Sequence, residues 1–405
     1  MLLLAKILTV FVLLVYLVRR NVNVGLALTS GAALFGLLFG LSPRQIAYTA
    51  LYSCIDSKTL NLLAVVLLIT LLGNVLKRME NLRMVVKSMG QLVADARIVM
   101  AAIPAFIGLM PMPGGAMLSA PLTGEVADKV GLGPESKTMV NYWFRHVWEY
   151  TFPLYPGIIL ASTLFGITLR DILLTNGPTN IFAVLVGILL ILAPIGKPKS
   201  SGGKHDKMAA VWALVKSIWP IAVVITANIV FGVDLILSLI AVLTVLFLQT
   251  RFFRGFSSAV FRESVTPSLV FLILSVMVFK SVIEETGGVS QLPELFVGYG
   301  IPIPLILFIV PFIVGMLLGL TVGYVGMTFP LLSVFISNGS FNYSYFMLAY
   351  VGGFMGVMAS PAHLCLVLTR EYYKADFKAV YRKIIPLVLM VSAFTWFLYL
   401  VKWPL

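Results

Sequence analysis

Ten stretches of this chain are apolar enough, and long enough, to cross a lipid bilayer whose hydrocarbon core is about 30 Å thick. They lie at 2–18, 24–40, 58–76, 137–168, 179–194, 210–230, 232–249, 267–284, 343–370 and 384–401. Hydrophobic residues make up 60% of the sequence and charged residues only 11%, so a water-soluble fold could not cover its apolar surface. The pattern predicts an all-α polytopic membrane protein with about ten transmembrane helices.

Two of these stretches, 137–168 and 343–370, are too long for one crossing and contain prolines in mid-span. This predicts helices that are broken inside the membrane. Two further apolar stretches, 98–128 and 302–337, rise to a Gly/Pro-rich point and return, as re-entrant hairpins do. Irregular backbone at membrane depth is tolerated only where protein buries it or where it lines a cavity. We therefore expect all of these breaks to lie in the protein interior.

The second half of the chain resembles the first at an offset of about 208–209 residues. PGGAMLSAPL at 113–122 aligns with VGYVGMTFPL at 322–331, and hydropathy agrees along both halves. Each half has five spans and one hairpin in the same order, and an odd number of crossings turns the second half upside down. We predict two inverted-topology repeats, 1–195 and 209–405, joined by a cytoplasmic linker at 196–208.

In such an arrangement the first hairpin opens from the cytoplasm and the second from outside. Their tips should meet near the membrane midplane, beside breaks expected at 151–156 and 359–361. A broken helix exposes unpaired N–H groups at one stub, which can hold an anion, and unpaired carbonyls at the other, which can hold a cation. The alternative is that the prolines and glycines only kink and pack ordinary helices.

The basic residues indicate the orientation. With the N-terminus outside, 21 lysine and arginine residues fall in cytoplasmic segments and four in external ones, the bias expected of a multi-pass protein of the cytoplasmic (inner) membrane. The net charge of +13 is thus a topology signal, and we expect no nucleic-acid partner. Segments 80–96 and 285–299 mix charged and apolar residues, so each is either an interfacial helix or an ordinary loop.

Residues 141–156, NYWFRHVWEYTFPLYP, form the densest polar cluster within any span. An ionisable residue there costs about 2.5–3.5 kcal/mol on insertion scales, so it should face protein or water. Arg145 and Glu149 are four residues apart, share a face of the first half-helix, and can pair, which would serve insertion alone. In the functional interpretation, Arg145 sets an anion preference while Glu149 or His146 exchanges a proton.

Ser360 and Pro361 have the residue types of an N-cap and a first helical residue, so they predict the start of the second half of the other broken helix. His363 would then occupy the third position, where its ring can contact a substrate or simply pack. Cys54 and Cys365 support neither a disulfide framework nor a metal cluster, and three histidines far apart in sequence favour no metal site. The sequence contains no enzymatic motif, and we expect no cofactor. A transported H+ or Na+ is the coupling ion expected to bind.

MPMPGGAMLSAPL and FRHVWEYTFPLYPG, set in two inverted halves, resemble the ion transporter superfamily, and within it an uncharacterised prokaryotic branch. That superfamily includes divalent anion/sodium symporters, gluconate permeases, arsenite permeases and the large membrane subunits of tripartite periplasmic transporters. The resemblance implies scaffold and transport domains, elevator-type movement and a homodimer. Neither hairpin tip contains the Ser-Asn-Thr signature of the dicarboxylate symporters, which argues against sodium/dicarboxylate transport. Arg145, His146 and Glu149 make proton coupling as plausible as sodium coupling.

The resemblance also implies substrate and cation sites at the hairpin tips and the breaks. The substrate-binding residues expected there are Pro113, Gly114, Gly115, Ser119, Arg145, His146, Thr151, Gly323, Tyr324, Thr328, Ser360 and His363. The residues expected to hold the coupling ion are Glu149, Pro111, Thr321 and Ala359. Together these features predict a secondary active transporter for a small anion, an organic acid or oxyanion, coupled to H+ or Na+. The alternatives are a cation/proton antiporter that uses Glu149 and a membrane scaffold subunit of a larger complex.

Overall fold

A computed structural model describes residues 2–78, 88–89, 92–93, 95–110, 114–196, 207–249, 257–337 and 339–404. Every regular element within these ranges is a helix. Among the described residues, six helices are long and apolar enough to cross a membrane: Leu2–Arg19, Ser57–Arg78, Leu169–Leu192, Met208–Ile229, Val260–Thr286 and Phe377–Leu400. Further apolar helices are shorter, at 10–17 residues. The prediction of an all-α polytopic membrane protein is confirmed.

The helices of the first half are α1 (Leu2–Arg19), α2 (Val24–Leu38), α3 (Pro43–Ile55), α4 (Ser57–Arg78), α6 (Ala96–Gly108), α7 (Ala116–Lys129), α8 (Pro134–Arg145), α9 (Pro156–Phe165) and α10 (Leu169–Gly187). A π-helical turn, η1 (Ile188–Leu192), continues α10. The helices of the second half are α11 (Lys207–Ile229), α12 (Leu235–Gln249), α13 (Ser257–Ser264), α14 (Pro267–Thr286), α15 (Leu292–Gly298), α16 (Ile303–Leu318), α17 (Thr321–Ile336), α18 (Tyr343–Met358), α19 (Leu364–Tyr373) and α20 (Phe377–Leu400).

The order of long and short helices in the first half recurs in the second. The paired helices α6–α7 and α16–α17 occupy the two ranges in which hairpins were expected, and the members of each pair pack on one another. A matching contact supports the correspondence. A Cβ at Gly108 of α6 would lie 2.2 Å from the carbonyl oxygen of Arg145, and one at Gly315 of α16 would lie 2.1 Å from that of Gly353. Both contacts let a hairpin helix approach the first half of a broken helix at backbone distance, as small residues do in membranes.

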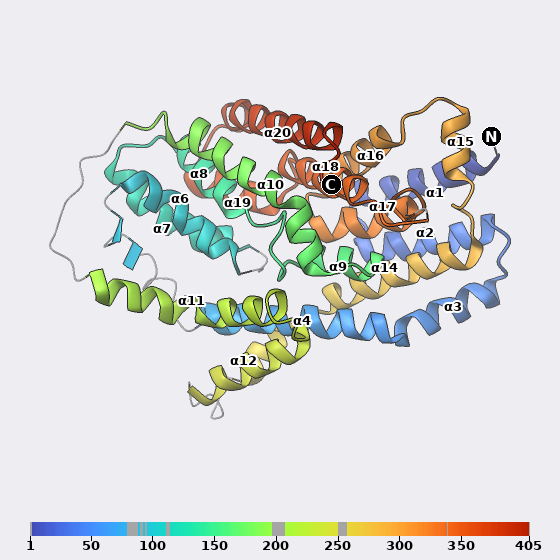
Figure 1. Ribbon diagram of the computed structural model, residues 1–405, viewed down its shortest axis with the longest axis horizontal. Helices are drawn as coiled ribbons and strands as arrows, with labels where there is room; N and C mark the ends of the chain where they lie inside the picture. Colours follow the sequence, from blue (N-terminus) through green and yellow to red (C-terminus); the bar gives the residue numbers. More distant parts are fainter. Residues whose placement is uncertain are drawn as a thin grey trace.

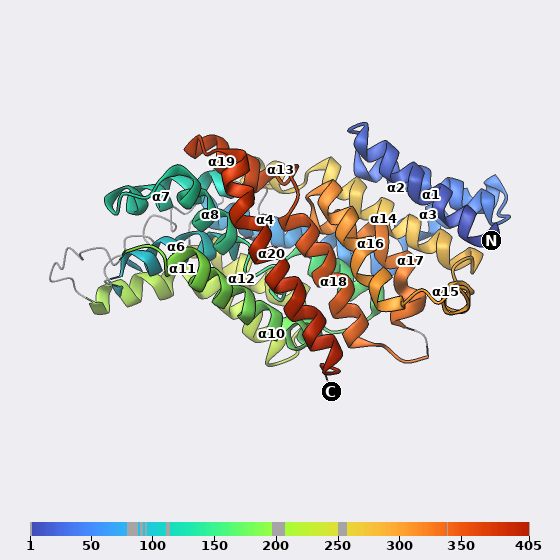
Figure 2. The ribbon, with the colours of Figure 1, turned by 90° about the horizontal axis from the view of Figure 1, so that it is seen from above.

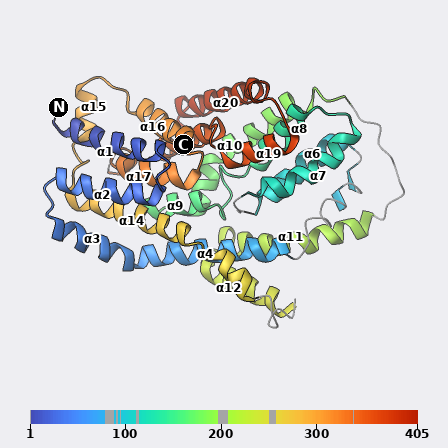
Figure 3. The ribbon, with the colours of Figure 1, turned by 180° about the vertical axis from the view of Figure 1, so that it is seen from behind.

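The two halves are interlocked. Helix α14 packs against α2 and α3, α17 packs against α9, and α19 packs against both α7 and α8. Figure 1 shows α1, α2 and α3 with α14–α17 at one end of the molecule, and α6, α7, α8 and α19 at the other. The views from above and from behind show the same arrangement, with the C-terminus near the middle (Figures 2 and 3). Elements from both halves therefore meet in the centre.

Several helix boundaries differ from the expected ones. We expected spans at 179–194 and 384–401, but α10 begins at Leu169 and α20 at Phe377. Polar residues hide these starts in a hydropathy profile, because Thr168 forms a capping box with Asp171, and Asp376 caps α20.

Two helices, α3 and α13, occupy segments where only loops were expected. For α3, the signal was a capping box between Ser42 and Gln45 with Pro43 at the first turn. Within the expected interfacial segment 285–299, α15 is helical over seven residues. Most of segment 80–96 and of the linker 196–208 lies outside the described residues.

Candidate site at the helix breaks

The first break follows Arg145, the last residue of α8, and runs as turns to Tyr155, after which α9 begins at Pro156. We expected the break at 151–156, with Arg145 and Glu149 on one helical face. Residues 151–155 do lie in the break, but it begins earlier, at His146. The expectation of a shared helical face is wrong, because Glu149 lies beyond the end of α8. Arg145 is therefore on a helix and Glu149 on the turns that follow it, so the i,i+4 geometry of a helical ion pair does not apply to them.

Hydrogen bonds from other helices hold the chain in these turns. The Tyr350 hydroxyl donates to the carbonyl of Glu149 over 3.0 Å, and the Asn176 amide donates to the carbonyl of Tyr150 over 2.9 Å. The Asn176 amide replaces the N–H of Leu154 that a continuing helix would supply to Tyr150. The Tyr350 hydroxyl satisfies the Glu149 carbonyl, for which Pro153 has no N–H. The break thus begins upstream of the expected range 151–156, and tertiary hydrogen bonds stabilise its turns.

The second break, between α18 and α19, lies where it was expected, but its details differ. Ser360 and Pro361 were expected to start the following helix, with His363 in its third position. Instead His363 is the N-cap of α19. The Ser360 hydroxyl accepts a hydrogen bond of 3.1 Å from the N–H of Ala362. This bond closes a local turn, and the helix begins only after His363.

The tip of the second hairpin lies against both breaks. Gly319 has a φ of +60°, and a Cβ there would lie 2.8 Å from the backbone nitrogen of His363 in the second break. Thr321, the first residue of α17, approaches the first break, because a Cβ at Gly157 would lie 2.5 Å from the methyl carbon of Thr321. The tip of the second hairpin therefore contacts both the first break and the second break.

The described part of the first hairpin also reaches the centre. The Tyr155 hydroxyl, from the end of the first break, donates to the carbonyl of Gly108 at the end of α6. Gly114 has a φ of +69°, and a Cβ there would lie 3.8 Å from a methyl carbon of Leu368 in α19. Pro111 and Pro113, expected to contribute to the coupling-ion and substrate sites, lie outside the described residues.

Four helices begin at these tips and breaks, and none of them has a side-chain cap. They are α7, α9, α17 and α19. Helices α8, α14 and α16 also begin without a side-chain cap, whereas side chains cap α10 and α20, the last helices of the two halves. An uncapped helix start leaves N–H groups available and carries partial positive charge, so it suits an anionic ligand.

Ionisable side chains are buried among these helix starts. Arg145 is 3% exposed, His146 1% and Glu149 9%. One carboxylate oxygen of Glu149 accepts a hydrogen bond of 2.9 Å from the Thr321 hydroxyl, and the other lies 3.8 Å from Nε2 of His146. Thr321 belongs to the second half, so this contact joins the first break to the second hairpin tip. A buried carboxylate with a hydroxyl partner has the chemistry to take up a proton or a hard cation.

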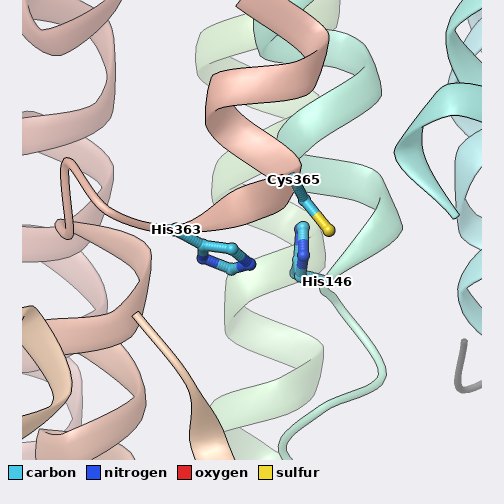
Figure 4. Close-up of side chains that lie close together, drawn as sticks. All are labelled: His146, His363 and Cys365. Atoms are coloured by element: carbon cyan, nitrogen blue, oxygen red, sulfur yellow. The ribbon is translucent and has the colours of Figure 1, made fainter. Parts of the chain in front are cut away.

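His146 and His363 come together across the two breaks, with ring centroids 4.7 Å apart. Tyr142 of α8 positions both. Its backbone carbonyl lies 2.6 Å from Nδ1 of His146, and its hydroxyl lies 3.0 Å from Nδ1 of His363. Cys365 completes the group, and Figure 4 shows the three side chains of His146, His363 and Cys365 pointing toward one another. The donor atoms of these three residues all lie within 4.8 Å of one another.

Three other expected site residues, Thr151, Tyr324 and Ala359, are buried and form hydrogen bonds with residues of other helices. The Thr151 hydroxyl donates to the side chain of Asn180 over 2.7 Å, and the Tyr324 hydroxyl donates to the carbonyl of Tyr350 over 2.8 Å. The carbonyl of Ala359 accepts from the Tyr381 hydroxyl over 3.1 Å.

Three more residues lie inside the hairpin helices. The hydroxyls of Ser119 and Thr328 donate hydrogen bonds to backbone carbonyls one turn earlier, at the start of α7 and in α17 respectively. Gly323 is in the first turn of α17, and a Cβ there would lie 2.8 Å from a methyl carbon of Leu318. Gly115 is the N-cap of α7 and is also buried. The hydroxyls of Ser119 and Thr328 thus support their own helices in this closed arrangement.

The sequence did not single out several residues that shape the centre. Tyr142, Asn176 and Tyr350 resemble ordinary span residues, and Cys365 was expected to take part in neither a disulfide framework nor a metal cluster. The sequence offered only a weak signal for these residues, namely a polar or aromatic side chain within a span and close to an expected break. Their importance follows from hydrogen bonds between residues more than 25 positions apart, such as that of Tyr142 with His363 at a separation of 221.

The structure defines a multi-pass α-helical membrane protein with a buried polar centre at its helix breaks. The described structure is similar to the crystal structure of the YdaH transporter of Alcanivorax borkumensis, which was reported to have an unusual topology. The match has a TM-score of 0.57 and 15% sequence identity and covers 90% of each chain. The chain belongs to the DUF401 family, described as proteins of unknown function, whose model matches residues 2–402. A comparison with curated proteins finds no match.

Proposed function

We propose that this protein is a secondary active transporter that moves a small anion, an organic acid or oxyanion, across the cytoplasmic membrane. The observation that carries the proposal is the set of uncapped helix starts at the tips and breaks, α7, α9, α17 and α19, together with the buried side chain of Arg145 at the end of α8. N–H groups and a guanidinium supply positive potential and hydrogen-bond donors, which is the chemistry that binds carboxylates and oxyanions. The similarity in fold to a transporter supports the same conclusion.

For coupling we propose Glu149 together with Thr321. Their hydrogen bond joins the two halves, so a change in the charge or the partners of the carboxylate alters the contact between the first break and the second hairpin tip. A proton would neutralise Glu149, whereas Na+ would bind its oxygens together with the Thr321 hydroxyl. The same carboxylate supports the second candidate, a cation/proton antiporter, in which no anion is required.

Transport requires a rearrangement, because the polar centre is closed. We propose that this rearrangement is an elevator-type movement of the hairpins and broken helices, in a homodimer held by the remaining helices. The inverted halves, the re-entrant course of the hairpins and the location in the inner membrane belong to the same proposal.

Uptake into proteoliposomes with imposed proton or sodium gradients tests the proposal. A panel of organic acids and oxyanions is offered to the wild-type chain, to Arg145→Ala and to the control Arg44→Ala, which changes an exposed residue of α3. We expect accumulation of at least one anion, loss of about 2–4 kcal/mol of anion binding in Arg145→Ala, and normal uptake in the control. Cation-stimulated proton efflux with no anion requirement would support the antiporter instead.

A further inference from the structure

We infer that His146, His363 and Cys365 form a binding site for a transition-metal cation of the Zn2+ class, bridging the two halves of the chain. The inference does not depend on the transport proposal, because it concerns equilibrium binding to the purified protein. Its starting point is the separation of the three donor atoms, at most 4.8 Å. In a tetrahedral zinc site, bond lengths of about 2.0–2.3 Å place ligand atoms roughly 3.3–3.7 Å apart, so small side-chain movements close the remaining gap.

The hydrogen bonds around His146 assign its tautomer. Nδ1 lies 2.6 Å from the carbonyl oxygen of Tyr142, and a carbonyl only accepts hydrogen bonds, so Nδ1 carries the ring proton. The Nε2 lone pair of His146 is therefore directed away from this carbonyl, on the side where the carboxylate of Glu149 lies 3.8 Å away.

The same reasoning applies to His363. The Tyr142 hydroxyl donates its hydrogen to the carbonyl of Met358, over 3.0 Å, so it can only accept a hydrogen bond from His363. Nδ1 of His363 also lies 3.2 Å from the carbonyl of Val357. Both neighbours being acceptors, Nδ1 carries the proton and Nε2 carries the lone pair. Histidines that bind metals are oriented in this way, with the second ring nitrogen donating to a carbonyl or a similar partner.

His146, His363, Cys365 and Glu149 thus bring two imidazoles, a thiol and a carboxylate together beside the buried guanidinium of Arg145, and all four residues are at most 9% exposed. The Cys365 thiol hydrogen-bonds with His146, and a bound cation would take the place of the thiol proton. Imidazole and thiolate ligands favour Zn2+ and related ions over Mg2+ or Ca2+. Binding releases the thiol proton of Cys365 and leaves a thiolate on the metal, with Glu149 or water in the fourth position. Such an ion would link the first break to the second, because His146 belongs to one and His363 to the other.

Cobalt spectroscopy tests this inference on the full chain, purified in detergent without a histidine tag. Co2+ serves as the probe and Zn2+ as the competitor. We expect one site per chain, a thiolate-to-cobalt charge-transfer band, and displacement of Co2+ by Zn2+. Cys365→Ser should abolish the band and, like His363→Ala, weaken binding by at least about tenfold. The matched controls Cys54→Ser and His205→Ala should retain both the band and the affinity.

A second measurement keeps the inference testable if the ligand variants fold poorly. In the Cys54→Ser chain, Zn2+ should protect Cys365 from alkylation by a maleimide, and a chelator should restore the reaction. Unchanged alkylation in the presence of Zn2+, or a charge-transfer band that persists in a folded Cys365→Ser chain, would overturn the inference. Loss of binding in His205→Ala alone would have the same consequence, since it would assign the metal to another place.

Discussion

The hydroxyl of Thr321 donates a hydrogen bond of 2.9 Å to the carboxylate of Glu149, across 172 residues of sequence. Thr321 is the first residue of α17, and Glu149 lies in the break between α8 and α9. The bond is therefore one of the places where the two halves of the chain are tied together by polar chemistry. Because both residues are less than 10% exposed, water does not replace the bond readily when it is lost.

Thr321→Val should impair coupling more than Thr321→Ser. Valine has nearly the same shape but no hydroxyl, so the carboxylate loses a hydrogen bond worth about 1.5–3 kcal/mol. We expect the concentration of H+ or Na+ that gives half-maximal transport to rise about tenfold or more in Thr321→Val. The measurement is uptake at varied gradient in proteoliposomes, and equal behaviour of the two variants would contradict a role for the hydroxyl.

Glu149→Gln should separate substrate movement from the ion gradient. The amide keeps the size of the side chain but can neither release a proton nor attract a cation by charge. We expect transport that no longer responds to an imposed gradient, with anion exchange retained. Glu125→Gln, at an exposed position of α7, is the matched control and should respond normally. A full gradient response in Glu149→Gln would remove this residue from the coupling site.

Gly315→Ala should destabilise the fold strongly. A Cβ at Gly315 would lie 2.1 Å from the carbonyl oxygen of Gly353, and backbone atoms cannot move aside as a side chain can. We expect a loss of about 1–3 kcal/mol or failure to fold, seen as a lower thermal midpoint in detergent. Gly177→Ala, inside α10 with open space around the new methyl group, should be neutral or stabilising by up to about 1 kcal/mol.

The inverted arrangement of the halves can be tested by labelling single cysteines with an impermeant maleimide. Lys129→Cys and Ser340→Cys are exposed and lie at the α7–α8 and α17–α18 connections of the two halves. In a chain without Cys54 and Cys365, we expect Lys129→Cys to react only from the cytoplasmic side and Ser340→Cys only from outside. Labelling of both from one side would show that the halves are not inverted.

Tyr142→Phe should weaken metal binding without removing a ligand. The lost hydroxyl contacts both the carbonyl of Met358 and Nδ1 of His363, so the His363 ring is less well oriented. We expect Co2+ affinity to fall about 10–100-fold while the charge-transfer band of the bound metal remains. Tyr48→Phe changes a tyrosine that is 71% exposed and should bind Co2+ normally. Unchanged affinity in Tyr142→Phe would mean that this hydroxyl does not orient the site.

Much of the helical architecture was predictable from the sequence, because the bilayer requires long apolar segments and because glycine and proline interrupt them. The paired helices α6–α7 and α16–α17 and the second break fall where the sequence pattern put them. The misplaced starts of α10 and α20 come from polar first turns, in which a capping residue such as Thr168 or Asp376 matters more than hydropathy.

The sequence by itself determined an all-α membrane fold and the neighbourhood of the polar centre, since both depend on local apolar length and on local breakers of helices. Only the tertiary structure decided where the first break begins, because Tyr350 and Asn176 bond the carbonyls of that break from distant helices. It also decided that His146 meets His363 and Cys365. Residues more than two hundred positions apart leave no periodic trace in one sequence, and their meeting follows from how the two halves pack.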